Sequence, residues 1–145
     1  MTLDEAAQIA KLLNDRNELD QELSAPSVLE DAQDYRYEVI DGAVVACVAR
    51  RRVQWYQWEI YHLSVASTFV KAGHAWRLYN QVATHAEENR ARILQCTIRE
   101  GNADSEGFFT RQGFSKVSRF LNARTGNVVG VWQKVLAAPN DTGQP

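Results

Sequence analysis

Cysteine is scarce in this sequence of 145 residues, and long apolar runs are missing. The two cysteines, Cys47 and Cys96, each lie in a short apolar stretch, where a small buried thiol is the usual interpretation. No run approaches the ~20 apolar residues of a membrane span. The acidic start at Met1 also lacks the apolar segment of a secretory leader. We therefore expect a soluble protein of a reducing compartment, the cytoplasm.

Histidine is rare as well, which bears on metal binding. The three histidines are His62, His74 and His85, and their spacing forms no tight ligand set with the two cysteines. The sequence predicts no metal site.

An excess of charge of one sign is also missing, since 16 Lys and Arg face 18 Asp and Glu, for a formal net charge of -2. This balance excludes a protein held to nucleic acid or membrane mainly by bulk positive charge. Residues 1–34, however, contain nine acidic and two basic side chains, so they carry −7 and the remaining residues carry +5. The sequence thus joins an acidic end to a basic body.

The hydrophobic content of 45% is sufficient for a domain with its own core. We expect a single domain over residues 1–136 and a disordered tail over residues 137–145.

Apolar periodicity divides the chain into helices and strands. Thr2 and Glu5 have capping-box spacing at the start of a helix that runs to about residue 15, with a stripe of Leu3 and later apolar residues. Asp41-Gly42 separates strand-like runs at 35–40 and 43–49 and predicts a tight hairpin turn. The remaining elements are expected in this order: a strand from about Trp55, a helix from Gly73, a strand at 94–98, a helix at 103–112 ended by Gly113, and strands at 114–121 and 127–136. The order predicts a mixed α+β protein with a mostly antiparallel sheet of about six to seven strands.

Two details of this pattern bear on function. Residues 16–34 fit either a short helix or a mobile loop. In the strand from Trp55, apolar residues occupy even positions up to Ile60 and odd positions from Leu63 onward. A strand cannot change faces without an extra residue, so we predict a β-bulge near Tyr61 and His62.

Two motifs follow this strand. The first, Val70-Lys71-Ala72-Gly73-His74-Ala75, opens a helix, and free amides at such a helix start can bind a pyrophosphate. Taken alone, its Gly and Ala fit close helix–sheet packing equally well. The second runs from Asn102 to Phe114. The pair resembles the acetyl-CoA signature of the GNAT N-acetyltransferase superfamily, Arg/Gln-x-x-Gly-x-Gly/Ala followed by Asn-x-x-Ala-x-x-Phe/Leu-Tyr-x-x-x-Gly-Phe.

The resemblance implies a GNAT-like fold, with a bulged, splayed central strand and flanking helices, and an acetyl-CoA-dependent N-acetyltransferase. Such enzymes transfer an acetyl group to a primary amine by direct attack in a ternary complex. An alkyl amine of pKa ~10.4 is almost fully protonated at pH 7, so freeing its lone pair costs roughly 4–5 kcal/mol. A base near the bulge would supply that step.

Three residues near the bulge are catalytic candidates by this resemblance. Glu59, 14 residues before Gly73, matches the spacing of a general base, with a strand-edge carboxylate facing water as the alternative. His62 is a candidate proton relay or substrate contact, or else a structural histidine. Tyr61 is a candidate acid, because Phe109 replaces the tyrosine of the second motif.

The resemblance also implies a set of acetyl-CoA-binding residues on the splayed strand, the loop and the two motifs. They are Leu63, Ser64, Val65, Val70, Lys71, Ala72, Gly73, His74, Ala75, Asn102, Phe109 and Arg111. Val70 departs from the family's Arg or Gln, which leaves binding by backbone amides intact, because amides do not depend on side-chain identity. Lys71 beside it can still offer charge to a phosphate.

For the acceptor we expect a cationic amine, on a small molecule or a protein, because residues 1–34 would help to build the acceptor side in this family. A catalytically silent CoA-binding or protein-interaction module is the alternative that Val70 and Phe109 favour. Arg50-Arg51-Arg52 is expected to be a solvated turn; its alternative, a contact to a phosphate-bearing acceptor, leaves transfer to a nucleic-acid amine open. Closing strands pair into dimers in many folds of this type, so a homodimer is also open.

Overall fold

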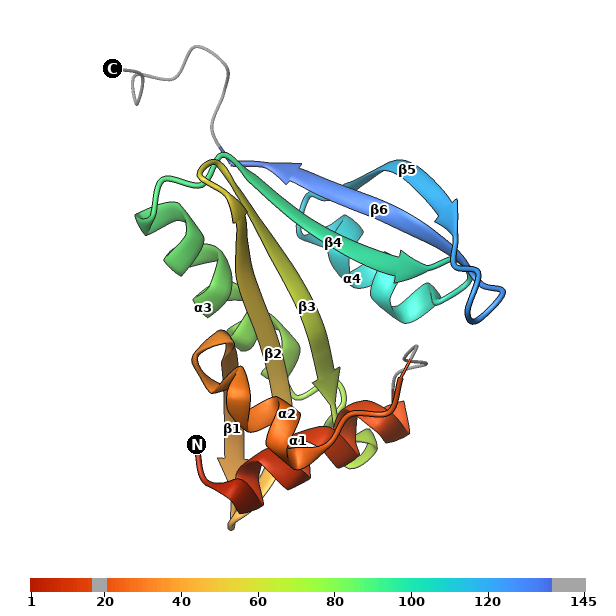
Figure 1. Cartoon of the computed structure of the whole chain (residues 1–145). Coiled ribbons are helices and arrows are strands. Elements are labelled where there is room, and N and C mark those ends of the chain that lie inside the picture. The colour runs from red at the N-terminus through yellow and green to blue at the C-terminus, as the bar shows by residue number, and fades with distance from the viewer. Residues whose placement is uncertain (17–20, 137–145) are drawn as a thin grey trace. The chain divides into compact units, whose positions relative to one another are not determined.

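The computed structural model describes residues 1–16 and 21–136 (Figure 1). The expected disordered tail lies outside the described residues. The elements are, in chain order, α1 (Leu3–Arg16), α2 (Ala25–Glu30), η1 (Ala32–Asp34), β1 (Tyr35–Ile40), β2 (Ala43–Gln54), β3 (Gln57–Val65), η2 (Ser67–Phe69), α3 (His74–Glu88), β4 (Ile93–Arg99), α4 (Ala103–Arg111), β5 (Ser115–Leu121) and β6 (Val128–Val135). Of the alternatives left open for residues 16–34, the short helix is present as α2 over residues 25–30, and residues 17–20 lie outside the described residues.

The strands form a six-stranded sheet in the order β1-β2-β3-β4-β6-β5. β1 pairs with β2, and β6 with both β4 and β5, in antiparallel fashion. β3 and β4 are parallel, which requires a crossover connection, and α3 lies in that connection. The predicted mixed α+β fold class is confirmed.

Two compact units divide the chain. Unit 1 comprises Met1–Arg51 and Ile60–Ala83, and unit 2 comprises Arg52–Glu59 and Thr84–Pro145. The expectation of one domain over residues 1–136 stays a prediction.

Local signals in the sequence are present in the structure where they were expected. The Thr2 hydroxyl accepts from the Glu5 amide at 3.0 Å and the Glu5 carboxylate accepts from the Thr2 amide at 2.8 Å, a capping box at α1. Asp41 and Gly42 have φ values of 50° and 80°, the left-handed conformation that a type I′ hairpin turn requires. Gly113, just after α4, has φ of 93°.

The core of unit 1 lies between α1, α2 and the first two strands. The buried residues of this cluster are Ala6, Ile9, Ala10, Leu12, Leu13, Val28, Tyr35, Val44, Cys47 and Ala49. Leu3 is 58% exposed, so its place in the predicted apolar stripe was wrong. It lies in the first turn of α1, where the helix has only begun.

The β1–β2 hairpin of unit 1 contains a β-bulge that the sequence did not predict. Glu38 of β1 pairs with Ala46, whereas the next residue, Val39, pairs with Val44, so Val45 is an extra residue on β2. Such a bulge bends the strand and changes the direction of neighbouring side chains.

The core of unit 2 is built on β4, β6 and α4. Leu94, Cys96 and Ile98 alternate as buried residues along β4, as the sequence predicts. From α4, the buried Phe109 packs its ring edge-to-face against Phe114, with centroids 5.1 Å apart.

Two expectations about residues 50–56 were wrong. β2 continues to Gln54 rather than ending at residue 49, and the turn falls at Trp55 and Tyr56, so β3 begins at Gln57, close to the expected start near Trp55. Arg50-Arg51-Arg52 is therefore part of a strand, not a solvated turn, because ladder hydrogen bonds come from the backbone and charged side chains do not end them. Arg50 itself is buried.

Burial along α1 predicts which of its leucines stabilise the protein. Leu13→Ala should lower the free energy of unfolding by roughly 2–5 kcal/mol, because Leu13 is fully buried and its truncation leaves a cavity. The matched control, Leu3→Ala, should change it by less than about 0.5 kcal/mol. Urea unfolding followed by circular dichroism measures both; equal losses would contradict the described core.

Candidate active site

A left-handed residue lies in β3 where the change of apolar phase predicts a β-bulge. His62 has φ of 54°, a left-handed value that costs a residue with a side chain roughly 1–2 kcal/mol. Its carbonyl oxygen accepts from the Cys47 thiol at 3.5 Å, and its Nδ1 lies 2.8 Å from the Tyr35 hydroxyl. These contacts hold the strained residue inside unit 1.

The electrostatic surroundings of His62 keep its imidazole neutral. Burial lowers the pKa of His62 to about 4; the charge of Arg51 adds to this effect and that of Asp31 opposes it. At physiological pH the ring therefore presents no positive charge to an approaching cation. It is a hydrogen-bonding group, placed beside the ring of Tyr35.

Tyr61 contacts Asp34, one of the acidic residues in the N-terminal segment 1–34. Its hydroxyl donates to Asp34 Oδ2 at 3.4 Å, and the Arg51 guanidinium lies 4.8 Å from its ring centre. Burial, with the charge of Asp34, raises the pKa of Tyr61 to about 12. The phenol stays protonated and serves as a donor.

Sequence reasoning missed Tyr35, which binds His62 from 27 residues away. No local pattern marks this pairing, because Tyr35 appears in the sequence as an ordinary first residue of a strand.

The loop between β3 and α3 leads to a helix start with open amides. Lys71 and Gly73 have left-handed φ values of 68° and 85°. Gly73 is the N-cap of α3, since its carbonyl accepts from the Arg77 amide at 3.1 Å. Glycine has no side chain to cap the first amides of the helix, so these donors and the helix dipole favour an anion.

The other α-helices of the described residues begin differently. At the starts of α1, α2 and α4, backbone amides donate hydrogen bonds to the side-chain oxygens of Thr2, Ser24 and Asn102, respectively. The open start of α3 is thus a local feature of this loop.

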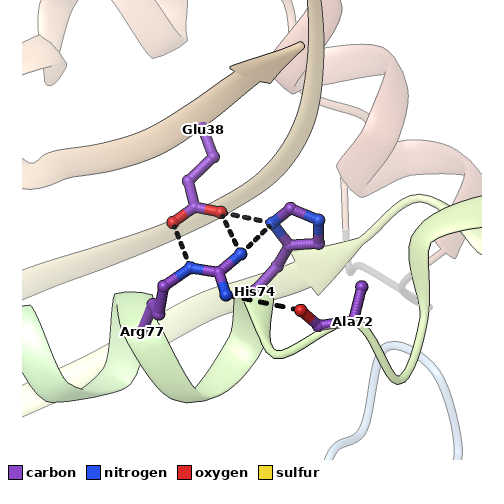
Figure 2. A network of polar contacts seen from close by, with 4 residues as sticks. All are labelled: Glu38, Ala72, His74 and Arg77. Carbon is purple, nitrogen blue, oxygen red and sulfur yellow. Dashed lines mark hydrogen bonds and ion pairs between the residues drawn. The ribbon is translucent and has the colours of Figure 1, made fainter.

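His74, expected among the acetyl-CoA-binding residues, is buried and its side chain is bound within unit 1. Its Nδ1 contacts the Glu38 carboxylate of β1, to which Arg77 donates from Nε at 3.2 Å and from Nη2 at 3.1 Å. Arg77 Nη1 also donates to the Ala72 carbonyl at 3.3 Å (Figure 2). We call these four residues the Glu38 network. Its donors, Arg77 above all, hold the pKa of Glu38 below its usual value.

Glu59 occupies a defined position in unit 2. The parallel pairing of β3 with β4 covers three residue pairs, and Glu59 with Gln95 is the last of them.

Burial, with the charge of Glu59, raises the pKa of Cys96, and burial raises the pKa of Cys47 to about 12. Both thiols stay protonated, so neither is suited to act as a nucleophile.

The remaining predicted residues of unit 2 have roles in α4. Asn102 accepts from the Ser105 amide at 3.3 Å as the N-cap, and Phe109 is buried. Arg111 is exposed in the last turn. The contacts of these three residues with acetyl-CoA stay predictions.

Each unit thus brings together part of the predicted site. Unit 1 contains Tyr61, His62, residues 63–65, the loop and the first turn of α3; unit 2 contains Glu59, Asn102, Phe109 and Arg111. Within residues 1–16 and 21–136, no cluster of three or more His, Cys, Asp or Glu side chains is arranged to hold a metal ion. Nor does any helix in these ranges have the length and apolar content needed to cross a membrane.

Comparison with known proteins connects this geometry to a family. The model of the acetyltransferase (GNAT) family matches residues 6–114. A search of the curated proteins finds no match. Among solved structures, the fold is similar to that of Ard1 from Thermoplasma volcanium, with 14% identity, a TM-score of 0.80 and coverage of 94% of this chain and 95% of that one.

Two further structures show the same likeness. The ribosomal-protein-alanine N-acetyltransferase from Brucella melitensis is 18% identical, with a TM-score of 0.78 and coverage of 94% and 97% of the two chains. A GNAT family acetyltransferase from Elizabethkingia anophelis with acetyl-CoA bound is 13% identical, with a TM-score of 0.71 and coverage of 87% and 89%. Because the family model covers most of the chain, the chain belongs to the GNAT family and is an acetyl-CoA-dependent acetyltransferase, as its two motifs predict.

The buried His62 predicts a loss of stability in mild acid. Its folded pKa near 4 lies below the ordinary value near 6.5, so the unfolded chain binds the proton more readily. The contribution of the neutral ring is complete above about pH 6.5 and falls by roughly 1–3 kcal/mol as the pH drops toward 4. Urea unfolding across this range should show a smaller pH dependence for His62→Gln than for the wild type; parallel curves would contradict the shifted pKa.

The loop at Gly73 predicts a position-specific effect on CoA binding. In Gly73→Ala, a side chain is strained at a φ of 85° and its Cβ would lie 3.0 Å from Arg77 Nη1, so the guanidinium or the loop must shift, and CoA should bind roughly tenfold more weakly. The control, Gly126→Ala, has a similar φ of 76° with no atom within 4 Å of its Cβ. Calorimetry with CoA compares the two. Equal affinities for both variants would show that this loop is not where CoA binds.

Proposed function

We propose that this chain transfers an acetyl group from acetyl-CoA to the primary amine of a cationic acceptor, by direct attack while both substrates are bound. The observation that carries the proposal is the start of α3, where open amides follow a loop with two left-handed residues. Membership of the GNAT family supports the choice of donor.

Backbone groups of unit 1 would hold the donor. The amides of His74 and Ala75 lie at the N-terminus of α3, where the helix dipole favours a negatively charged group such as the pyrophosphate. Lys71, exposed in the loop, adds a positive charge there. Residues 63–65 would pair their backbone with the extended arm of the donor, as an added strand does.

In the proposed reaction, Glu59 takes the proton that the ammonium must lose, directly or through a water. Acetyl-CoA supplies a thioester, whose carbonyl carbon the freed amine attacks. The N–C bond forms and the C–S bond breaks. The nitrogen releases its second proton to solvent as the amide forms, and the sulfur leaves as a thiolate that takes a proton from solvent. Tyr61, whose phenol is protonated, and the neutral His62 would orient the amine substrate near the predicted bulge.

The charges around the bulge support a cationic acceptor. Asp34 accepts from Tyr61, and Asp31 acts electrostatically on both Tyr61 and His62. The acidic end of residues 1–34 therefore lies beside two of the candidate catalytic side chains. A neutral His62 adds no repulsion, so a lysine side chain, a protein N-terminus or a polyamine can approach.

Substitution of the proposed base tests the reaction. Glu59→Gln should lower kcat by roughly 10²–10⁴-fold, because the amide cannot accept the proton, and should leave the Kd for CoA unchanged. Glu88→Gln, at an exposed position at the end of α3, is the control and should behave like the wild type. Thiol release with a panel of amines and calorimetry with CoA provide the two measurements.

Each other outcome selects an alternative. Unchanged turnover in Glu59→Gln would remove Glu59 as the base. CoA binding by the wild type without turnover of any amine would favour the catalytically silent module.

A further inference from the structure

The loop that precedes α3 holds an unfavourable conformation with little help from burial. Lys71, Ala72 and Gly73 are all exposed, and two of the three have left-handed φ values. For Lys71 this conformation costs roughly the 1–2 kcal/mol expected of a residue with a Cβ. Val70 and Ala72 have no polar side-chain atoms with which the loop could stabilise its own turn.

The Glu38 network supplies a contact that holds this loop. Arg77 lies between Glu38 and Ala72, with Nη1 bonded to the Ala72 carbonyl (Figure 2). The same Nη1 would lie 3.0 Å from a Cβ at residue 73, so the guanidinium fits there because residue 73 is glycine. The Ala72 carbonyl is thereby engaged by a donor, and the amides that follow it remain open for an anion.

The position of Arg77 is in turn determined by Glu38 and His74. Arg77 donates to both carboxylate oxygens, and His74 Nδ1 meets the same Oε1 that Nη2 meets. His74 Nδ1 also lies 2.8 Å from Arg77 Nη2, so the imidazole contacts both partners of this ion pair. Glu38 accepts from Nε and Nη2 of Arg77, a charge-assisted bidentate arrangement that fixes the guanidinium plane.

Glu38 reaches these donors from a different element. It is the last β1 residue before the register shift against β2, and bulges of this kind reorient adjacent side chains. His74 is 36 residues away in sequence and buried, which fixes its ring. The ring of Phe69, in η2, packs edge-to-face on it at 5.9 Å, so both ends of the loop meet the network.

We propose that Glu38, His74 and Arg77 are positioning residues that hold the Val70–Gly73 loop in the conformation that binds the pyrophosphate of CoA, without touching the acceptor or the reacting atoms. This inference rests on the proposed function, because it assumes that the pyrophosphate lies at the start of α3. It assigns the affinity for one end of the donor to side chains outside both sequence motifs.

The expected effect follows from the population of the binding conformation. The apparent Kd is the intrinsic Kd divided by the fraction of molecules with a competent loop. If breaking the network lowers that fraction to about one tenth, the Kd for CoA rises about tenfold while kcat at saturating donor stays unchanged. A ligand that does not use the loop should be unaffected.

The test compares CoA with pantetheine, which lacks the pyrophosphate and the nucleotide. By calorimetry, Glu38→Gln and Arg77→Met should bind CoA roughly tenfold more weakly and bind pantetheine like the wild type. Arg77→Lys keeps the charge but loses the planar fork, so its Kd for CoA should lie between those of the wild type and Arg77→Met. In assays, KM for acetyl-CoA should rise while kcat and the acceptor KM stay constant.

Glu100→Gln is the matched control, since the Glu100 carboxylate also accepts from two cations, Lys116 and Arg119, at 3.3 and 3.4 Å. It should bind CoA normally. Arg77 is 46% exposed, so its variants test the role even if Glu38→Gln is poorly folded. Failure of the wild type to bind CoA would overturn the proposed function as well. Normal CoA binding by Glu38→Gln and Arg77→Met, or equal losses for CoA and pantetheine, would overturn the positioning role alone.

Discussion

The first turn of α3 exposes backbone amides that its N-cap residue, Gly73, cannot satisfy. Free amides at a helix start need an acceptor, and α1, α2 and α4 obtain one from the side chains of Thr2, Ser24 and Asn102. α3 leaves this place to an anion or to water. The left-handed loop before it, and the side chains that hold that loop, follow from keeping these donors open.

β1 has a larger part in this arrangement than its place at the end of the sheet order indicates. Its first residue, Tyr35, bonds to His62, and its Glu38 binds His74 and Arg77. Of the two left-handed residues with side chains between the start of β3 and α3, His62 is bonded to β1 directly, and the proposed role of the Glu38 network would connect the loop that contains Lys71 to the same strand. Strain at a functional site persists where surrounding contacts hold it, and here β1 provides those contacts.

Neutral polar groups and a carboxylate lie together around His62. Burial keeps His62 neutral and Tyr61 protonated, while Asp34 stays within hydrogen-bonding reach of Tyr61. A cationic amine would thus meet negative charge and neutral polar groups. The near-zero net charge of the chain hides this local asymmetry, because the acidic residues 1–34 are offset by the basic remainder.

The sequence by itself determined most of the elements, the Asp41-Gly42 turn, the irregularity near His62 and the open helix start at Gly73, because each of these depends on a local pattern of neighbouring residues. The two motifs also determined the family. Tertiary structure alone decided that Tyr35 meets His62, that Glu38 meets His74 across 36 residues, and that Arg50 is buried. Those contacts depend on strand register and on the bulge at Val45, which periodicity does not report because residues 44–49 of β2 are apolar and buried without alternation.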